Sequence, residues 1–469
     1  MAGGGGGDDD AAPVLPRAQQ PSVGGRRGHR QKATWLPLDV IILEIAARSD
    51  PATLVRCAAT CRDARRRIAE DPDLHGRLRL RDTERFVLPL LRGHMTPITT
   101  YTRGGLSKTD VFLVDAVATT AADSTRLVKA TFASGADAET LRNVVPMDSR
   151  RGLFLVHATT TTTQTNPYQY QRQLFVWNPA TRRRLVLPPE PAFPVDDPGA
   201  GRSTDVQYVL VVGEGAGADA FIGRPFQVLK AKLVLSEKYR SHRRLLVQTF
   251  SSEHGAWSPR TEIPTPNLHG SNESSPSPLQ RRPLVVGDVV HWLCLTDSGS
   301  YLLMLNVRAA ARVSVTALPA SFPRDSKNNQ SPYPYPYDGR HYQYLLATAT
   351  AGGNPVVLVA DADRISGWEL SKHTKMWKPQ PQVVVEKEAI QRFMRGKWCV
   401  PRLELFGEKS GALLLRIPGC CLLWLDLHTK KIIRCISLDR LLHAQVYCPY
   451  EMDLSSWVPT FNSAVLSFD

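Results

Sequence analysis

Residues 282–319, RPLVVGDVVHWLCLTDSGSYLLMLNVRAAARVSVTALP, show how most of this chain is built. Apolar runs alternate in this stretch with short polar segments that contain Gly, Asp, Ser or Pro. Short apolar runs bounded by turn residues predict strands joined by hairpins, because the pattern lacks the period of a helix. The stretch therefore predicts a small antiparallel sheet.

The same pattern recurs along the chain. It is found at residues 151–189, 243–264, 354–379 and 408–436. In each unit an apolar strand precedes a polar turn, and a strand with Trp or aliphatic residues follows. The spacing of about 50 to 80 residues suits blades of about four strands with long loops, and repetition around an axis leaves few exposed edges. We predict a large, mostly-β domain over residues 95–469 that closes as a β-propeller; a pair of β-sandwiches is the alternative.

The N-terminal part of the chain has a different period. Residues 35–68 read WLPLDVIILEIAARSDPATLVRCAATCRDARRRI. Pro37 suits the first turn of a helix, and apolar residues follow it at helical spacing. Asp50 can cap a second helix with Pro51 at its first position, and residues 62–68 form a third. This part predicts a small all-α unit of three helices.

The helical unit carries more apolar residues than its own core needs. A unit of roughly forty residues is below the size that usually supports an independent core. A leftover apolar face therefore predicts docking, either helix against helix on a partner or onto the rest of this chain. Periodicity alone leaves both possibilities open.

The order of residues in this unit resembles an F-box. The matching positions are Leu36, Pro37, Asp39, Val40, Ile41, Glu44, Ile45, Arg48, Pro51, Leu54, Val55, Arg56, Cys57, Cys61 and Arg62. The segment AEDPDLHGRLRLR, residues 69–81, is similar to the tail that often follows the F-box in plant proteins. The family often has Trp at the position of Ala64, so this chain has less packing in its third helix.

Two phrases of the β-rich part also look like a known region. VWNPATRRRLVLPP, residues 176–189, and VVGDVVHWL, residues 285–293, resemble the F-box-associated β-propeller region of plant F-box proteins. Together the patterns predict a disordered tail at 1–33, an F-box at 34–80, a connector at 81–94 and the propeller-like domain at 95–469.

The F-box resemblance implies an adaptor function. The helices would bind the Skp-type subunit of an SCF-type cullin-RING ubiquitin ligase, and through it the cullin and RING subunits, while the β-rich domain would bind an unknown target protein. The implied adaptor contacts are Leu36, Pro37, Leu38, Val40, Ile41, Ile45, Leu54 and Val55. No catalytic residue, cofactor or metal is expected on this chain, because the chemistry would lie on the other subunits.

The charge of the chain favours a second function. Its 58 basic and 44 acidic side chains give a net charge of +14, which would attract nucleic acid, although the charge is spread rather than clustered. Nucleic-acid binding is the alternative, and a propeller enzyme is a third. Gly213, Gly215 and Ala218 form a G-x-G-x-x-A pattern after a predicted strand, but Pro225 falls where a helix should run, so a flexible loop is predicted. His291 is expected to be structural.

Cysteine usage and the N-terminal composition indicate the compartment. Eight cysteines spread over 469 residues do not resemble a disulfide framework. Cys57 and Cys61 lie one helical turn apart, but no further Cys pair or nearby His completes a set of four metal ligands, so core packing is predicted. The tail lacks the apolar core of a signal peptide, and no segment suits a membrane span. The expected location is cytoplasmic, nuclear or both.

Overall fold

The three-dimensional structure is a computed structural model of the chain. It describes residues 38–80, 86–101, 107–116, 126–132, 141–161, 170–193, 206–213, 224–235, 243–270, 282–308, 312–324, 342–361, 363–393, 400–437 and 446–461. The predicted disordered tail lies outside the described residues.

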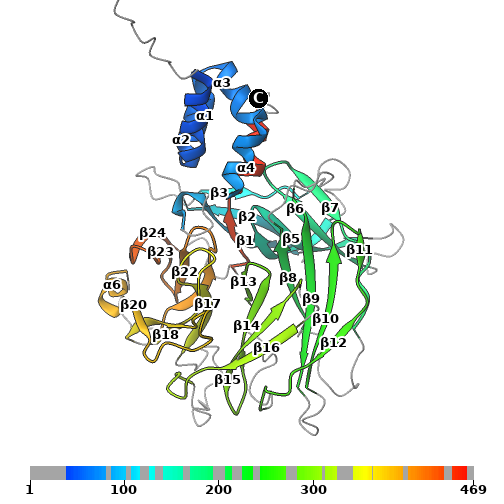
Figure 1. Cartoon of the computed structure of the whole chain (residues 1–469), viewed down its shortest axis with the longest axis vertical. Helices are drawn as coiled ribbons and strands as arrows, with labels where there is room; N and C mark the ends of the chain where they lie inside the picture. The colour runs from blue at the N-terminus through cyan, green and yellow to red at the C-terminus, as the bar shows by residue number, and fades with distance from the viewer. Residues whose placement is uncertain are drawn as a thin grey trace, which may run out of the picture.

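Six antiparallel sheets, here called blades 1 to 6, surround a common centre (Figure 1). Blade 1 contains β25 (Pro449–Glu451), β1 (Leu91–Tyr101), β2 (Ser107–Asp115) and β3 (Leu127–Lys129). Blade 2 contains β4 (Leu141–Arg150), β5 (Leu153–Thr161), β6 (Tyr170–Asn178) and β7 (Arg183–Val186). Blade 3 contains β8 (Gln207–Val212), β9 (Phe226–Val234) and β10 (Arg244–Ser251), and both β11 (Ala256–Trp257) and β12 (Thr261–Pro264) pair with β10.

The other three blades have the same plan of four strands in chain order. Blade 4 contains β13 (Leu284–Val286), β14 (Val289–Leu295), β15 (Ser300–Asn306) and β16 (Arg312–Ala317). Blade 5 contains β17 (Gln343–Thr348), β18 (Pro355–Ala360), β19 (Arg364–Glu369) and β20 (Gln382–Glu386), followed by α6 (Lys387–Gln391). Blade 6 contains β21 (Arg402–Phe406), β22 (Ala412–Ile417), β23 (Cys421–Asp426) and β24 (Lys431–Ser437).

This arrangement confirms the predicted class, a helical region followed by a β-propeller. The five repeats found in the sequence correspond to blades 2 to 6. Blade 1 escaped notice because its strands come from both ends of the chain: β25 pairs with β1, with Gly93 opposite Tyr450 and His94 opposite Pro449. The C-terminal strand therefore closes the ring.

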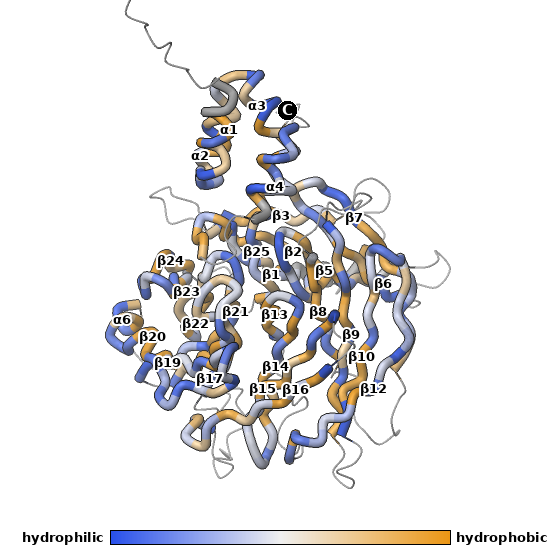
Figure 2. Tube along the Cα trace, in the orientation of Figure 1, coloured by the Kyte–Doolittle hydropathy of each residue, from blue (hydrophilic) through white to orange (hydrophobic). Residues whose placement is uncertain are grey.

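The hydrophobic core lies in layers between neighbouring blades. Separate clusters join blades 1 and 2, 2 and 3, 3 and 4, and 6 and 1, and one larger cluster joins blades 4, 5 and 6. Figure 2 shows hydrophobic segments alternating with hydrophilic ones along the blades. At the outer edge, the indole Nε1 of Trp257 donates to the carbonyl of Pro188 at 3.1 Å, and that of Trp377 to the carbonyl of Ala317 at 2.8 Å. These hydrogen bonds link blade 3 to blade 2 and blade 5 to blade 4.

Four helices form the N-terminal unit, at one end of the molecule (Figure 1). They are α1 (Leu38–Arg48), α2 (Pro51–Thr60), α3 (Arg62–Glu70) and α4 (Pro72–Leu80). Asp50 caps α2 by accepting from the backbone N–H of Thr53 at 2.9 Å, as its position predicts. The structure has one helix more than the three predicted, because Asp71 accepts from the N–H of Leu74 at 2.6 Å and Pro72 follows it at the first helical position.

The core of the helical unit is completed by the C-terminal end of the chain. After β25, the chain forms α7 (Leu454–Trp457) and the 3-10 helix η3 (Val458–Phe461), which pack on α4 and α3. Buried Leu454 and Val458 join Leu54, Ile68 and other apolar residues of the helices in one cluster, with Leu90 of η1 (Leu88–Leu90). Part of the apolar surplus therefore docks onto this chain. The propeller strands begin at Leu91 rather than at 95.

A buried ion pair ties this C-terminal segment to the propeller. Arg224, just before β9, donates from Nε and Nη2 to the carboxylate of Asp453 at 2.6 and 2.7 Å. Asp453 also caps α7 by accepting from the N–H of Ser455 at 3.2 Å. Gly152 lies beneath it with a φ of +77°, and a Cβ there would come within 3.1 Å of the Asp453 Cβ. Burial acts to raise the pKa of Asp453, but Arg224 and the serine hydroxyls outweigh it and hold that pKa below its usual value.

We expect Arg224→Met to lower the free energy of unfolding by about 3–5 kcal/mol, because it leaves the Asp453 carboxylate buried without its cation. Urea denaturation of the full chain measures the effect. The control is Arg66→Met, which removes an exposed ion pair with Asp63 and should change the free energy of unfolding little, because water screens that pair. The added change Asp453→Asn should recover part of the loss. If Arg224→Met and Arg66→Met lowered the free energy of unfolding equally, the stabilising role assigned to the buried Arg224–Asp453 pair would be contradicted.

Candidate functional site

The helical unit leaves an apolar face uncovered on α1 and α2. Ile45 on α1 is 49% exposed and Val55 on α2 is 44% exposed. Ala52 and Ala59 are also exposed, and with Val55 they follow one stripe of α2 at helical spacing. α7 and η3 cover the opposite side of the unit, where α3 and α4 lie (Figure 1). This face lies on a unit whose interior is already filled.

Ion pairs hold α1 in place beside this face. The carboxylate of Glu44 accepts from both terminal nitrogens of Arg77 on α4, at 2.8 and 3.0 Å. Arg48 approaches the same carboxylate at 3.3 Å. The hydrogen bonds from Arg77 lower the pKa of Glu44. Because these groups are exposed, their role is to orient α1 against α4 more than to add stability.

The structure places the predicted adaptor contacts in three groups. Leu36 and Pro37 lie outside the described residues, and so do the side chains of Leu38, Val40 and Ile41, whose backbone belongs to α1. Ile45 and Val55 are exposed and available to a partner. Leu54 needs correction: it is completely buried in the core that the helices share with α7, so it has no surface to offer a partner.

The two cysteines of this unit have different roles. Cys57 packs against the helical core, as predicted. Cys61 is exposed, and its Sγ accepts from the N–H of Ala64 at 3.3 Å, so it caps α3 instead of packing in the core. Ala64 itself is buried. Within the described residues, no group of His, Cys, Asp and Glu is arranged to hold a metal ion.

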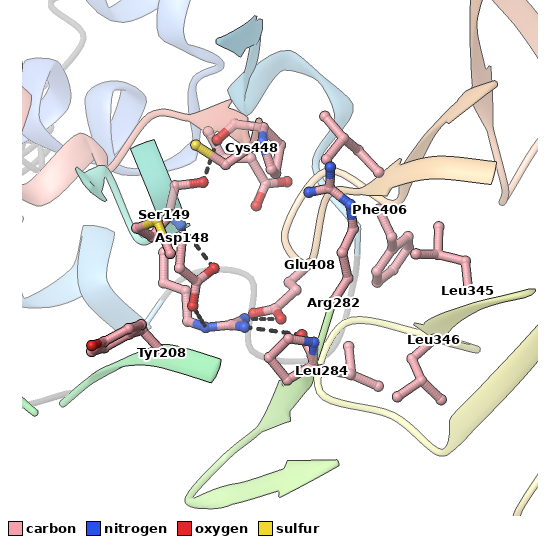
Figure 3. A pocket seen from close by; sticks show the side chains of 16 residues that line it. Asp148, Ser149, Tyr208, Arg282, Leu284, Leu345, Leu346, Phe406, Glu408 and Cys448 are labelled. Atoms are coloured by element: carbon pink, nitrogen blue, oxygen red, sulfur yellow. Dashed lines mark hydrogen bonds and ion pairs between the residues drawn. The ribbon is translucent and has the colours of Figure 1, made fainter. Parts of the chain in front are cut away.

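The second candidate site is the channel at the centre of the propeller (Figure 3). A cavity of about 70 Å³ is lined by the first strands of blades 2 to 6, or residues next to them, and by β25. Its polar lining residues include Asp148, Ser149, Arg150, Tyr208, Arg282, Glu408, Cys448 and Glu451. A cavity of this size holds a few water molecules and is far smaller than the ~300–1,000 Å³ of usual small-molecule sites.

Charged groups of the channel form bonds across the ring, with each other and with backbone carbonyls. Arg150 of blade 2 pairs with Glu408 of blade 6, and its Nη2 donates to the carbonyl of Pro283 beside blade 4 at 3.2 Å. Arg282 donates to the carbonyls of Tyr447 and Val446 at 2.5 and 2.7 Å, just before the closing strand. These bonds hold the closing segment and the blades together.

Burial shifts the titration of these channel groups. It raises the pKa of Asp148, against the charge of Arg150 and backbone N–H groups, and it raises the pKa of Glu451, against hydrogen bonds from the Ser410 hydroxyl and backbone N–H groups. It lowers the pKa of Arg150. Asp148 accepts from the N–H of Leu210 at 2.8 Å, and Glu451 accepts from that of Ser410 at 2.6 Å. The acidic groups are thus committed to bonds that link blades.

The remaining sequence candidates that the structure describes, His291 and Gly213, do not line this cavity. His291 lies in β14, 4% exposed, and burial lowers its pKa to about 4, which fits the structural role expected of it. Gly213 follows β8, and the chain is described again from Arg224, with β9 beginning at Phe226. The predicted loop with Gly215 and Ala218 lies outside the described residues. A local sequence pattern does not reveal the bonds across the ring, such as that of Arg150 with Glu408, because their residues are distant in sequence.

One family model matches most of the chain. Residues 114–463 match the model of a domain of unknown function, DUF7595. The chain belongs to the DUF7595 family. The DUF7595 match begins inside β2 and ends just after η3, so it includes α7 and leaves α1 to α4 outside. No F-box family model matches those helices.

Known proteins add limited detail on this DUF7595 protein. No curated protein matches the chain. One similar solved structure comes from a study of two prolyl endopeptidases, with 12% identity, a TM-score of 0.34, and coverage of 82% of this chain and 54% of that one. Another is the acylaminoacyl peptidase of Pyrococcus horikoshii, with 7% identity, a TM-score of 0.32, and coverage of 74% and 45%.

A third similar structure is the β-propeller domain of the trilobed protease from Pyrococcus furiosus, with 8% identity, a TM-score of 0.28, and coverage of 64% of this chain and 71% of that one. The DUF7595 chain spans about half the length of the first two structures. Among the helices that the structure describes, none has the length and apolar character needed to cross a bilayer.

Proposed function

We propose that this DUF7595 protein is the substrate-recognition subunit of an SCF-type cullin-RING ubiquitin ligase. Its helical unit binds the Skp-type subunit, and its propeller binds the target protein. The observation that carries the proposal is the exposure of Ile45 and Val55 on helices whose core is already completed by α7. Apolar residues that are exposed together are typical of a protein-binding face, and Val55 with Ala52 and Ala59 forms such a stripe on α2.

The identity of the partner rests on the sequence resemblance. The order of residues in α1 to α3 resembles an F-box, and the exposed positions Ile45 and Val55 are among those that the resemblance assigns to the Skp-type subunit. Binding would bury a helix face against helices of the partner. Cullin and RING subunits would then join through the Skp-type subunit.

The propeller supports a binding role for the rest of the chain. The cavity described in its channel is small, and polar groups lining it are engaged in bonds between blades, as Arg150 is with Glu408. A group tied up in this way is poorly placed to act on a substrate. In our proposal the chain is therefore not an enzyme, needs no cofactor, and uses the outer surfaces of its blades to hold a target.

We expect Ile45→Asp and Val55→Asp each to weaken binding to a purified Skp-type subunit by about 100-fold. Burying an aliphatic side chain is worth about 1.5–3 kcal/mol, and burial of an unpaired carboxylate adds a penalty. Isothermal titration calorimetry measures the affinity. The matched control is Val186→Asp on blade 2, which changes a valine of similar exposure and should leave binding unchanged.

Circular dichroism of each variant shows whether the helices remain folded. Unchanged affinity in a folded Ile45→Asp variant would remove the basis of the proposal. Binding of single-stranded nucleic acid that weakens steeply with salt would instead favour the alternative based on net charge, because released counterions give such binding a strong salt dependence.

A further inference from the structure

Blade 6 brings two cysteine thiols together at the outer edge of the propeller. Cys421 begins β23, and Cys435 lies near the end of the edge strand β24. Cys421 is opposite Ser437, and Cys435 is opposite Leu423, so the two cysteines share one face of the sheet as diagonal neighbours. Cys435 is exposed, whereas Cys421 is buried.

The two thiols also interact directly. A hydrogen bond to Cys435, with burial as the second cause, raises the pKa of Cys421. Cys420 adjoins the pair, and its Sγ donates to the carbonyl of Phe393 at 2.9 Å. The exposed thiol of Cys435 is thus accessible to a reagent in water, whereas the thiol of Cys421 is buried beside it.

We propose that Cys435 and Cys421 form a reversible disulfide when a hydroperoxide oxidises the protein. The Cys435 thiolate attacks the terminal peroxide oxygen, the O–O bond breaks, and a sulfenic acid forms as the alcohol or water leaves. The Cys421 sulfur then attacks the sulfenic sulfur, the S–O bond breaks, and water leaves. Two thiols and one hydroperoxide thus give one disulfide, one alcohol and one water, with both electrons passing to the peroxide.

The geometry of β24 makes this disulfide easy to reduce. Diagonal neighbours have Cα atoms about 7–8 Å apart, whereas a disulfide usually needs about 4.4–6.8 Å, so β24 must slide along β23 or twist locally before the two sulfur atoms can bond. Within the described residues β24 pairs with β23 and has no strand on its other side, so it can move. A strained, exposed disulfide has a high reduction potential, and a small thiol reduces it readily.

The position of the pair gives its oxidation a structural effect. Arg434, next to Cys435, donates from Nη1 to the carbonyl of Ala116 at 3.2 Å and so joins blade 6 to blade 1. Blade 1 is the blade in which the C-terminal strand β25 pairs with β1 and closes the ring. Movement of β24 on oxidation therefore acts on the contact between blade 6 and this closing blade.

The test treats the full chain with hydrogen peroxide, blocks the remaining thiols by alkylation and maps the peptides by mass spectrometry. We expect a linked peptide that contains Cys421 and Cys435, which disappears after dithiothreitol and is lost in Cys435→Ser. The matched control Cys61→Ser removes another exposed thiol and should keep the linked peptide. Oxidised Cys435 with Cys421 still open to alkylation, a link from Cys435 to Cys420, or no reaction at all would each overturn the proposal.

Discussion

A chain that ends at Gln445 should lose cooperative folding. The truncation removes β25 from the sheet of blade 1, and it removes Leu454 and Val458 from the core of the helical unit. Each of these two side chains is worth about 1.5–3 kcal/mol, and the lost strand exposes the edge of β1 as well. Because a whole domain is stable by only about 5–15 kcal/mol, the loss approaches the total.

Differential scanning calorimetry and circular dichroism test this expectation. The control is a chain that ends at Phe461, which keeps every described residue of the C-terminal segment. It should melt like the full chain, while the chain ending at Gln445 should show no cooperative transition or one at a much lower temperature. A sharp, unshifted transition in the shorter chain would mean that β25 does not hold the ring closed.

Mild acid should destabilise the protein through two buried histidines. Burial lowers the pKa of His94 to about 3, with Arg416 and Arg282 as the charged groups that add to the effect. Burial lowers the pKa of His291 to about 4, where Lys372 and Lys375 also oppose a positive charge. His94 is fully buried, and neither ring nitrogen has a hydrogen-bond partner among the described residues.

The direction of this effect follows from the lowered pKa values. The unfolded chain protonates its histidines near pH 6.5, well before the folded chain does, so acid favours unfolding. The stability that the neutral histidines contribute is complete above about pH 6.5 and is lost as the pH falls toward 4. Each histidine changes the free energy of unfolding by about 1.4 kcal/mol per pH unit, or about 5 kcal/mol for both over two units.

Urea denaturation between pH 7 and pH 4.5 measures the slope. We expect His94→Leu to flatten the fall in stability, because the group that takes up a proton on unfolding is gone. The exposed His254 supplies the control, and His254→Leu should keep the slope of the unaltered chain. The comparison between variants matters, since the raised pKa values of buried Asp148 and Glu451 act in the opposite direction. Parallel slopes in all three proteins would contradict the prediction.

For the candidate helical site, the sequence predicts where the helices lie. It does not predict which of their side chains are buried and which are exposed. Asp50 and Pro51 mark the start of α2 by local chemistry, which a neighbouring fold does not alter. Leu54 and Val55 are adjacent apolar residues, yet one is buried and the other is exposed. Helical periodicity gives two possible faces, and the chain that packs on the unit decides which face is inside.

The sequence by itself determined the propeller class, because alternating strands and turns are local and recur through blades 2 to 6. It also determined the helical character of the first unit. Tertiary structure alone decided how the ring closes and where the helices dock, since both depend on the C-terminal segment. The pair of Arg224 with Asp453 joins residues 229 positions apart. No local pattern encodes such a contact, because it forms only when the hydrophobic layers between the blades have brought the two distant segments together.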